Sequence, residues 1–201
     1  ENRFGRYQSH GSLEIMYQGN TLAASGYPTN GTGGGWDWNV VPGATTVHYT
    51  SWAEMMPKQS LTQRFDQYSN GTNFSGALAD GRFGVFATNL SQSDKYGSNT
   101  VFTSTGLVAH KSVFMLDSVL VALGTDISSS GSYSDEMLTA TNLFQSIISP
   151  TVGSLVVNGE MVSAAYSEDL PNNQSNWIVA PTGTGFYLPV GNDAVRVVYG
   201  Q

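Results

Sequence analysis

Cysteine is absent from this chain of 201 residues, so disulfide bonds, thiolate catalysis and cysteine-ligated zinc are excluded. Charged residues are scarce too, at 11% of the chain against about a quarter in an average soluble protein. Lysine and arginine together number 8 and the net charge is −7, which makes nucleic acid and anionic membrane surfaces unfavourable partners. No segment approaches the roughly eighteen consecutive apolar residues of a membrane-spanning helix.

The composition that remains is that of a globular chain with many turns. Hydrophobic residues make up 40%, and 23 glycines accompany abundant serine, threonine, asparagine and glutamine. Such a profile is typical of secreted β-rich proteins. We find no repeat, linker or change of composition, so we expect residues 1–201 to form one domain. Because the chain begins with Glu1 rather than methionine, we expect an excised domain or a processed product.

Alternation of apolar and polar residues predicts short strands along most of the chain. Asp80-Gly81 and Asn158-Gly159 predict tight hairpin turns. Leu138 to Ile148 fits a strand or a helix, and we favour the strand. The predicted fold class is all-β, a large antiparallel β-sandwich with few or no helices. The expected elements are a helix at 51–56 and strands at 12–17, 47–49, 74–78, 82–90, 101–105, 107–116, 119–123, 155–157, 160–164, 177–180, 186–188 and 195–199.

The segment from Gly33 to Val47, GGGWDWNVVPGATTV, is the most distinctive in the chain. Trp36 and Trp38 lie on one side of an extended segment and Asp37 on the other. Pro42-Gly43 predicts a turn. The two indoles could form a platform for a sugar ring or plug the end of a sandwich core. Since large aromatic side chains are usually buried, physical reasoning alone slightly favours the plug.

Few side chains indicate a particular chemistry. The three histidines have no partners at metal-ligand spacing, so we expect no metal site. His48 and His110 lie in strand patterns and are expected to make core or edge hydrogen bonds, whereas His10 is the histidine most expected to be exposed. Arg3 and Arg6 suit recognition of carboxylate or sulfate, but a salt bridge within the loop is the preferred interpretation.

Three stretches, in order, carry a resemblance to a known family. Residues 1–17, ENRFGRYQSHGSLEIMY, resemble the segment that opens the central β-sandwich of polysaccharide lyase family 8. GWDWNVVPGATTVHY resembles that family's Trp/Pro-Gly-Thr-Thr signature. KSVFMLDSVLVALGTDI, with TATNLFQ, is similar to its Lys-x-x-Phe strand pair and the strand that follows. The GWDWN and LFQ sequences are most similar to those of the chondroitin ABC lyase type. The resemblance covers roughly residues 1–165.

This resemblance implies a fold of super-sandwich type and a role in β-elimination. The family cleaves uronic-acid-containing glycosaminoglycans with a histidine, a tyrosine and an arginine on an upstream α/α toroid. A supporting glutamate is expected just before Glu1, so no catalytic residue is expected within the chain. We predict that Asn2, Arg6, Trp36 and Trp38 contact substrate on one wall of the cleft. The resemblance implies no cofactor.

The implied partners are an acidic polysaccharide and the toroid of the same polypeptide, in a secreted or periplasmic bacterial enzyme. The alternative is a free-standing carbohydrate-binding or structural sandwich module. We predict that the isolated chain lacks lyase activity, because the catalytic side chains lie elsewhere. Within the signature, we expect one tryptophan to anchor the loop in the core, and the sequence leaves open which one.

Overall fold

The structure is a computed structural model in which the chain divides into two compact units. One unit comprises Glu1–Leu13 with Trp38–Asn142, and the other comprises Glu14–Asp37 with Leu143–Gln201. The residues it describes are 10–15, 36–37, 39–48, 74–91, 106–130, 138–146, 148, 153–163 and 165–200.

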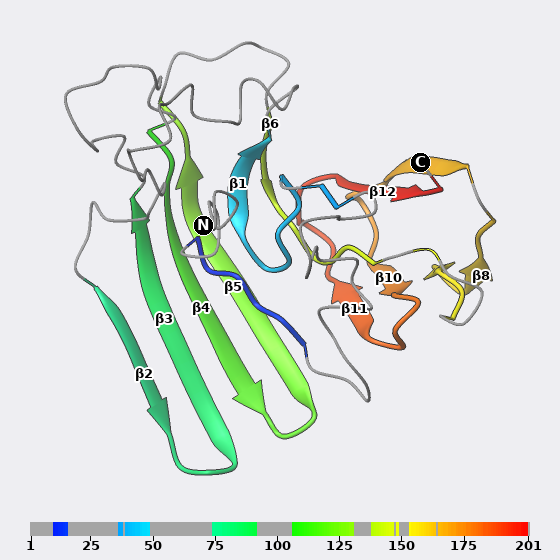
Figure 1. The fold of residues 1–201 in the computed structure, drawn as a ribbon. Coiled ribbons are helices and arrows are strands. Elements are labelled where there is room, and N and C mark those ends of the chain that lie inside the picture. Colours follow the sequence, from blue (N-terminus) through cyan, green and yellow to red (C-terminus); the bar gives the residue numbers. More distant parts are fainter. Residues whose placement is uncertain are drawn as a thin grey trace, which may run out of the picture. The chain divides into compact units, whose positions relative to one another are not determined.

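The first unit contains a four-stranded antiparallel meander in the order β2-β3-β4-β5 (Figure 1). Its strands are β2 (Ser75–Ala79), β3 (Phe83–Ser91), β4 (Val108–Leu116) and β5 (Val119–Ser128). At the turn between β2 and β3, Asp80 Oδ1 accepts hydrogen bonds from the backbone of Phe83 at 2.7 Å and Arg82 at 3.0 Å. These two bonds lower the pKa of Asp80, because they stabilise its ionised form. The hairpin predicted at Asp80-Gly81 is confirmed.

The two faces of strand β4 differ in burial. Ala109 and Val113 are buried, whereas Val108, Phe114 and Leu116 are exposed. The sequence placed Lys111 on the face opposite these three, and the alternation of exposure agrees. It is therefore the lysine side of β4 that faces the interior, and the small residues beside Lys111 leave room for its aliphatic stem.

A second antiparallel pair in this unit joins β1 (Thr45–His48) to β6 (Leu138–Thr141). Thr45 lies opposite Thr141, and their hydroxyl oxygens are 2.9 Å apart. The strand favoured over a helix for Leu138 to Ile148 is confirmed for its first four residues. Val47 and both threonines of β1 are fully buried, so β1 belongs to the interior of the unit, whereas β6 is exposed at its two ends.

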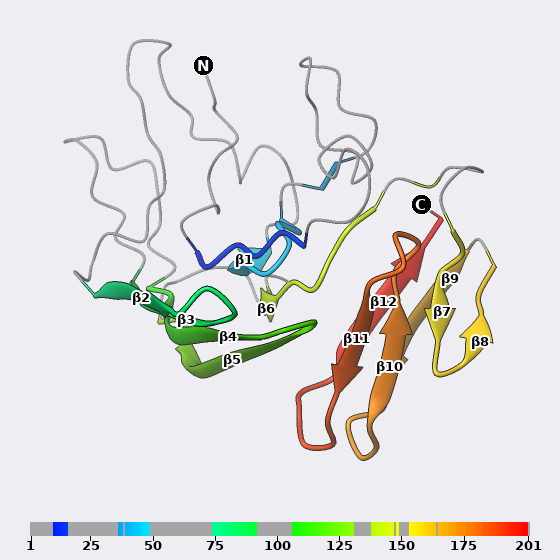
Figure 2. The same ribbon diagram turned by 90° about the horizontal axis from the view of Figure 1, so that it is seen from below.

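The second unit is a small sandwich of two antiparallel sheets (Figure 2). Its larger sheet has the order β11-β10-β7-β8 and its smaller sheet pairs β12 with β9. Leu155, Val157, Leu170, Ile178 and Val197 come from both sheets and form one buried apolar cluster. The strands are β7 (Val156–Val157), β8 (Glu160–Met161), β9 (Tyr166–Leu170), β10 (Asn176–Val179), β11 (Gly185–Leu188) and β12 (Val195–Tyr199).

The predicted hairpin at Asn158-Gly159 has the backbone that its sequence requires. The φ angles are 51° at Asn158 and 91° at Gly159, both positive as in a type I′ turn. Asn158 also donates its backbone N–H to Trp177 O at 2.7 Å, and its side-chain oxygen accepts from Trp177 N at 2.8 Å. The turn is thereby joined to β10, the neighbouring strand.

Strand β5 is longer than the strand predicted at 119–123, and β8 is shorter than the one predicted at 160–164. Two further elements differ in kind from the sequence-based expectation. Residues 12–15 alternate in exposure as predicted, but they form no strand. Strand β9 was not predicted, because its sequence, Tyr-Ser-Glu-Asp-Leu, has only one apolar residue at each end. The helix expected at 51–56 and the strand expected at 101–105 lie outside the described residues. Within the described part of the chain there is no helix and every strand pairing is antiparallel, which confirms the all-β class.

Candidate functional site

The Pro-Gly turn of the signature is a hydrogen-bonded β-turn. Ala44 N donates to Val41 O at 3.0 Å, and Gly43 has a φ of 75°. Proline at the second position and a residue of positive φ at the third are the marks of a type II turn. Glycine is also needed for space, since a Cβ at Gly43 would lie 2.3 Å from Leu13 N. The turn predicted from Pro42-Gly43 is confirmed.

Asn142, in the TATN stretch, directly follows β6 and holds this turn. Its Nδ2 donates to Ala44 O at 3.2 Å and Thr46 Oγ1 at 3.1 Å, and it reaches Asn39 O at 2.9 Å. Its backbone N donates to Ala44 O, and its own carbonyl accepts from Gly43 N at 2.8 Å. Because Asn142 is buried, one side chain satisfies several polar groups that water cannot reach.

His48 completes the network around Asn142. Its Nε2 lies 2.8 Å from Asn142 Oδ1. An amide oxygen only accepts, so His48 must carry its proton on Nε2. The core or edge hydrogen bond predicted for His48 is confirmed.

Lys111 of β4 holds the same turn from the other side. Its ammonium group donates to Gly43 O and, at 3.4 Å, to Gly11 O. Burial lowers the pKa of Lys111 from 10.5 to about 8, since the charged form is the more poorly solvated one in the interior. A Cβ at Gly11 would lie 2.8 Å from Lys111 Cδ, so Gly11 makes room for the stem.

The N-terminal segment packs onto the turn through its backbone. Leu13 N donates to Pro42 O at 2.9 Å, and His10 O accepts from Thr45 N at 3.1 Å. His10 has no exposed surface. The expectation that His10 is the most exposed histidine is therefore wrong. Its turn-like sequence belongs to a segment that is hydrogen-bonded to the signature, and this segment is packed rather than solvated.

The first half of the signature is held in the second unit. Gln145 Nε2 donates to Asp37 O at 2.9 Å, and Gln145 Oε1 accepts from Asp37 N at 3.1 Å. One side-chain amide thus pairs with both polar groups of a residue as a neighbouring strand does. Trp36 is 7% exposed and the Asp37 residue is exposed. Burial of Trp36 favours the anchoring role that the sequence left unassigned between the two tryptophans.

Comparison with known proteins places these features in a family. The model of polysaccharide lyase family 8, super-sandwich domain, matches residues 1–199. The chain belongs to polysaccharide lyase family 8. No solved structure matches it.

The relatives of this chain include three curated proteins. It is 33% identical over 190 residues to the chondroitin sulfate ABC endolyase of Proteus vulgaris and 30% identical over 199 residues to the chondroitin sulfate ABC exolyase of the same organism. It is 27% identical over 198 residues to the chondroitin sulfate ABC exolyase of Bacteroides thetaiotaomicron. Each match covers 94% of the chain but only 17% or 18% of the relative. The chain therefore spans about a sixth of the length of these proteins.

Four residues of the chain were predicted to bind substrate. Of these, only Trp36 lies among the residues that the structure describes, and its role in binding stays a prediction. Asn2, Arg6 and Trp38 lie outside the described residues. Sequence reasoning from single residues missed Lys111, Asn142 and Gln145 as the groups that hold the signature. All three lie in the stretches KSVFMLDSVLVALGTDI and TATNLFQ, so the resemblance had marked the right stretches without assigning the contacts.

Among the described residues of the chain, no cluster of three or more histidine or acidic side chains is arranged to hold a metal.

His110 pairs with Asp126, with 3.0 Å between Nδ1 and Oδ2, on an exposed part of β4 and β5. Asp126 has a φ of 53° where the pairing of these strands is irregular, so a bulge brings its carboxylate to the histidine. In the described part of the chain no helix is long and apolar enough to cross a membrane.

The burial of Lys111 predicts an unusual dependence of stability on pH. Its pKa is lower in the folded chain than in the unfolded chain, so between about pH 8 and 10.5 the unfolded state binds more protons and stability rises with pH. Below that window both states are protonated and the burial cost is constant. We expect wild type to gain on the order of 2–3 kcal/mol relative to Lys111→Met as pH rises through the window.

Urea unfolding of wild type and Lys111→Met at a series of pH values measures this gain. Arg82→Met is the control, since it removes an exposed cation from the β2–β3 turn of the same unit. If the difference in free energy of unfolding between wild type and Lys111→Met stayed constant from pH 8 to 10.5, this would contradict the lowered pKa.

Proposed function

We propose that this chain is the central β-sandwich domain of a larger lyase that cleaves uronic-acid-containing glycosaminoglycans of the chondroitin or hyaluronan type. The observation that carries the proposal is the match of 94% of the chain to enzymes named as chondroitin sulfate ABC lyases. The alternative of a free-standing module has less support, because each relative continues far beyond the matched segment.

In the proposed reaction a base abstracts the C5 proton of the uronate while its carboxylate is neutralised. The electron pair forms the C4–C5 double bond, the bond from C4 to the glycosidic oxygen breaks, and an acid protonates the leaving oxygen. We place these acid and base groups on an upstream α/α toroid, as the family resemblance implies. The β-sandwich would form one wall of the cleft.

The signature would shape that wall rather than react. Gln145 fixes the Asp37 backbone in one unit, and Asn142 with Lys111 fixes the Pro42-Gly43 turn in the other. Rigid loops hold a bound substrate in a reactive position better than mobile ones do. The chain carries a net charge of −7, which repels a polyanion, so the proposal requires basic groups elsewhere in the complete enzyme.

We also propose that the enzyme works in the periplasm or outside a bacterial cell, because its substrate is a polymer that does not enter the cytoplasm. Fractionation of cells that produce the complete polypeptide, followed by immunoblotting, tests this location. Recovery of the mature protein in the cytoplasm alone would overturn it.

The activity is tested by comparing the complete polypeptide that contains this domain with the 201-residue chain. Each is incubated with chondroitin sulfate, and the ultraviolet absorbance of the unsaturated product is followed. We expect product from the complete polypeptide and none from the chain alone. Product from the chain alone, or a folded complete polypeptide that yields none from chondroitin sulfate or hyaluronan, would refute the proposal.

A further inference from the structure

Two exposed aromatic side chains lie next to each other on the larger sheet of the second unit. Trp177 of β10 and Tyr187 of β11 are direct cross-strand partners, so they project from the same side of the sheet. Their ring centroids are 4.4 Å apart with 40° between the ring planes. Trp177 is 57% exposed and Tyr187 is 51% exposed, whereas Ile178, which points the other way, is buried in the core. The pair is therefore a surface feature and no part of the core cluster.

Hydrogen bonds restrain the Tyr187 ring and the Trp177 backbone. The hydroxyl oxygens of Tyr187 and Ser175 are 3.1 Å apart, and Trp177 N donates to Asn158 Oδ1 at 2.8 Å. Asn158 returns a bond from its own N–H to Trp177 O. Such a pair loses little conformational freedom when a ligand stacks on it, which favours binding.

The surroundings of the pair are neutral, polar and open. Residues 172–190 contain no charged side chain, and they include exposed amides such as Gln174. Gly185 leaves open space beside Tyr187 on the same side, because a Cβ there would meet nothing within 4 Å. Val179, 36% exposed, extends the apolar surface next to Trp177. Rings that offer an apolar face, with amides and hydroxyls around them, suit a pyranose, which has a C–H face and hydroxyls at its rim.

From these observations we propose that Trp177 and Tyr187 form a saccharide-binding platform, separate from the signature, that stacks against a sugar unit of the polysaccharide chain. The choice of a glycosaminoglycan as the sugar rests on the proposed function. Stacking on the pair needs no cation, which matters because residues 143–201 contain four acidic residues and a single arginine.

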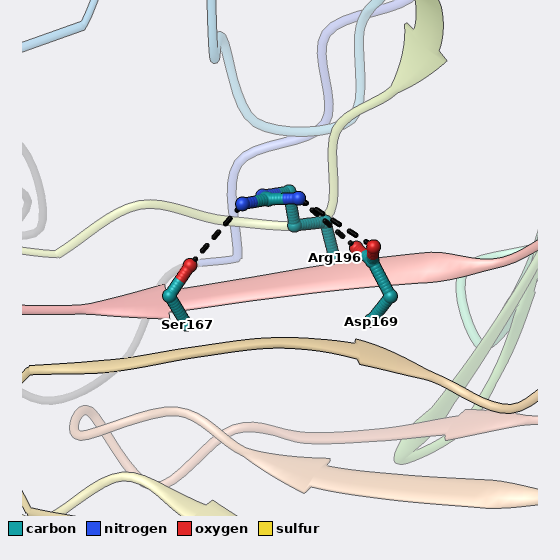
Figure 3. A network of polar contacts seen from close by, with 3 residues as sticks. All are labelled: Ser167, Asp169 and Arg196. Atoms are coloured by element: carbon teal, nitrogen blue, oxygen red, sulfur yellow. Dashed lines mark hydrogen bonds and ion pairs between the residues drawn. The ribbon is translucent and has the colours of Figure 1, made fainter.

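That arginine, Arg196 on β12, already has partners (Figure 3). Its guanidinium lies 3.4 Å from an Asp169 oxygen and 3.3 Å from Ser167 Oγ on β9. Binding at the platform would thus proceed against a weakly repulsive acidic surface. Added salt screens that repulsion, so binding should be unchanged or stronger as ionic strength rises. A basic patch that binds a polyanion behaves in the opposite way.

Affinity electrophoresis of the 201-residue chain in gels that contain unsulfated chondroitin tests the platform. We expect retardation of wild type, about a tenfold weaker association for Trp177→Ala, and partial recovery for Trp177→Phe, which keeps a smaller ring. Phe83→Ala is the matched control, because Phe83 is an exposed aromatic residue of the first unit. Circular dichroism verifies that each variant is folded.

Three results would overturn the platform. The first is equal retardation of wild type and Trp177→Ala, and the second is retardation that falls steeply with salt in both. The third is the behaviour of a domain contact: wild type is not retarded, and Trp177→Ala lowers the melting temperature of the complete polypeptide but not that of the chain. Retardation requires no catalysis, so this test and the activity test fail independently.

Discussion

Replacing Asn142 with leucine should lower the free energy of unfolding by about 4 kcal/mol, since it removes several buried hydrogen bonds at once. Leucine has a side chain of similar size but no hydrogen-bonding group for Ala44 O, Thr46 Oγ1 or His48 Nε2. Each buried polar group left without a partner costs about 1–3 kcal/mol. Asn142→Asp should be at least as harmful, because acceptor oxygens would then face the carbonyl of Ala44.

Urea unfolding of the 201-residue chain, followed by circular dichroism, measures the effect as a shift of the midpoint. Asn173→Leu makes the same chemical change at an exposed turn position and should alter stability by about 0.5 kcal/mol at most. If the two variants had similar midpoints, Asn142 would not be the residue that holds the signature turn.

The sequence predicted local features well where a single residue type decides them. Asn158-Gly159 and Asp80-Gly81 gave the hairpins, and Pro42-Gly43 gave the turn, because positive φ favours glycine and asparagine whatever the rest of the chain does. Alternation gave β3, β4 and β10. Strand β9 was not predicted, because its middle residues are exposed and polar. Its pairing with β12 also depends on a partner almost thirty residues away.

The groups that hold the signature could not be assigned from the sequence for a related reason. Asn142 and Lys111 lie about 100 and 70 residues from the turn atoms that they contact. No spacing rule connects them, and a lysine in a strand pattern is far more often a solvated side chain. The predicted exposure of His10 was wrong for the same reason, because the burial of a short loop depends on which segments pack over it. Only the resemblance selected the stretches that contain these residues.

The second large effect is expected at Gly43, where Gly43→Ala should destabilise the chain by about 3 kcal/mol or more through strain and overlap together. A left-handed conformation costs a residue with a Cβ about 1–2 kcal/mol. The new Cβ would also lie 2.3 Å from Leu13 N and 2.5 Å from Leu13 Cβ. Leu13 would have to move, and its bond to Pro42 O would be lost.

Gly159→Ala separates these two contributions. Gly159 has a φ of 91°, close to that of Gly43, but a Cβ at this position would meet nothing within 4 Å, so only the backbone strain of about 1–2 kcal/mol remains. The difference between the two urea midpoints then reports the close approach of the N-terminal segment to the signature turn. Equal losses in the two variants would mean that this segment yields freely, and that Gly43 is required for its conformation alone.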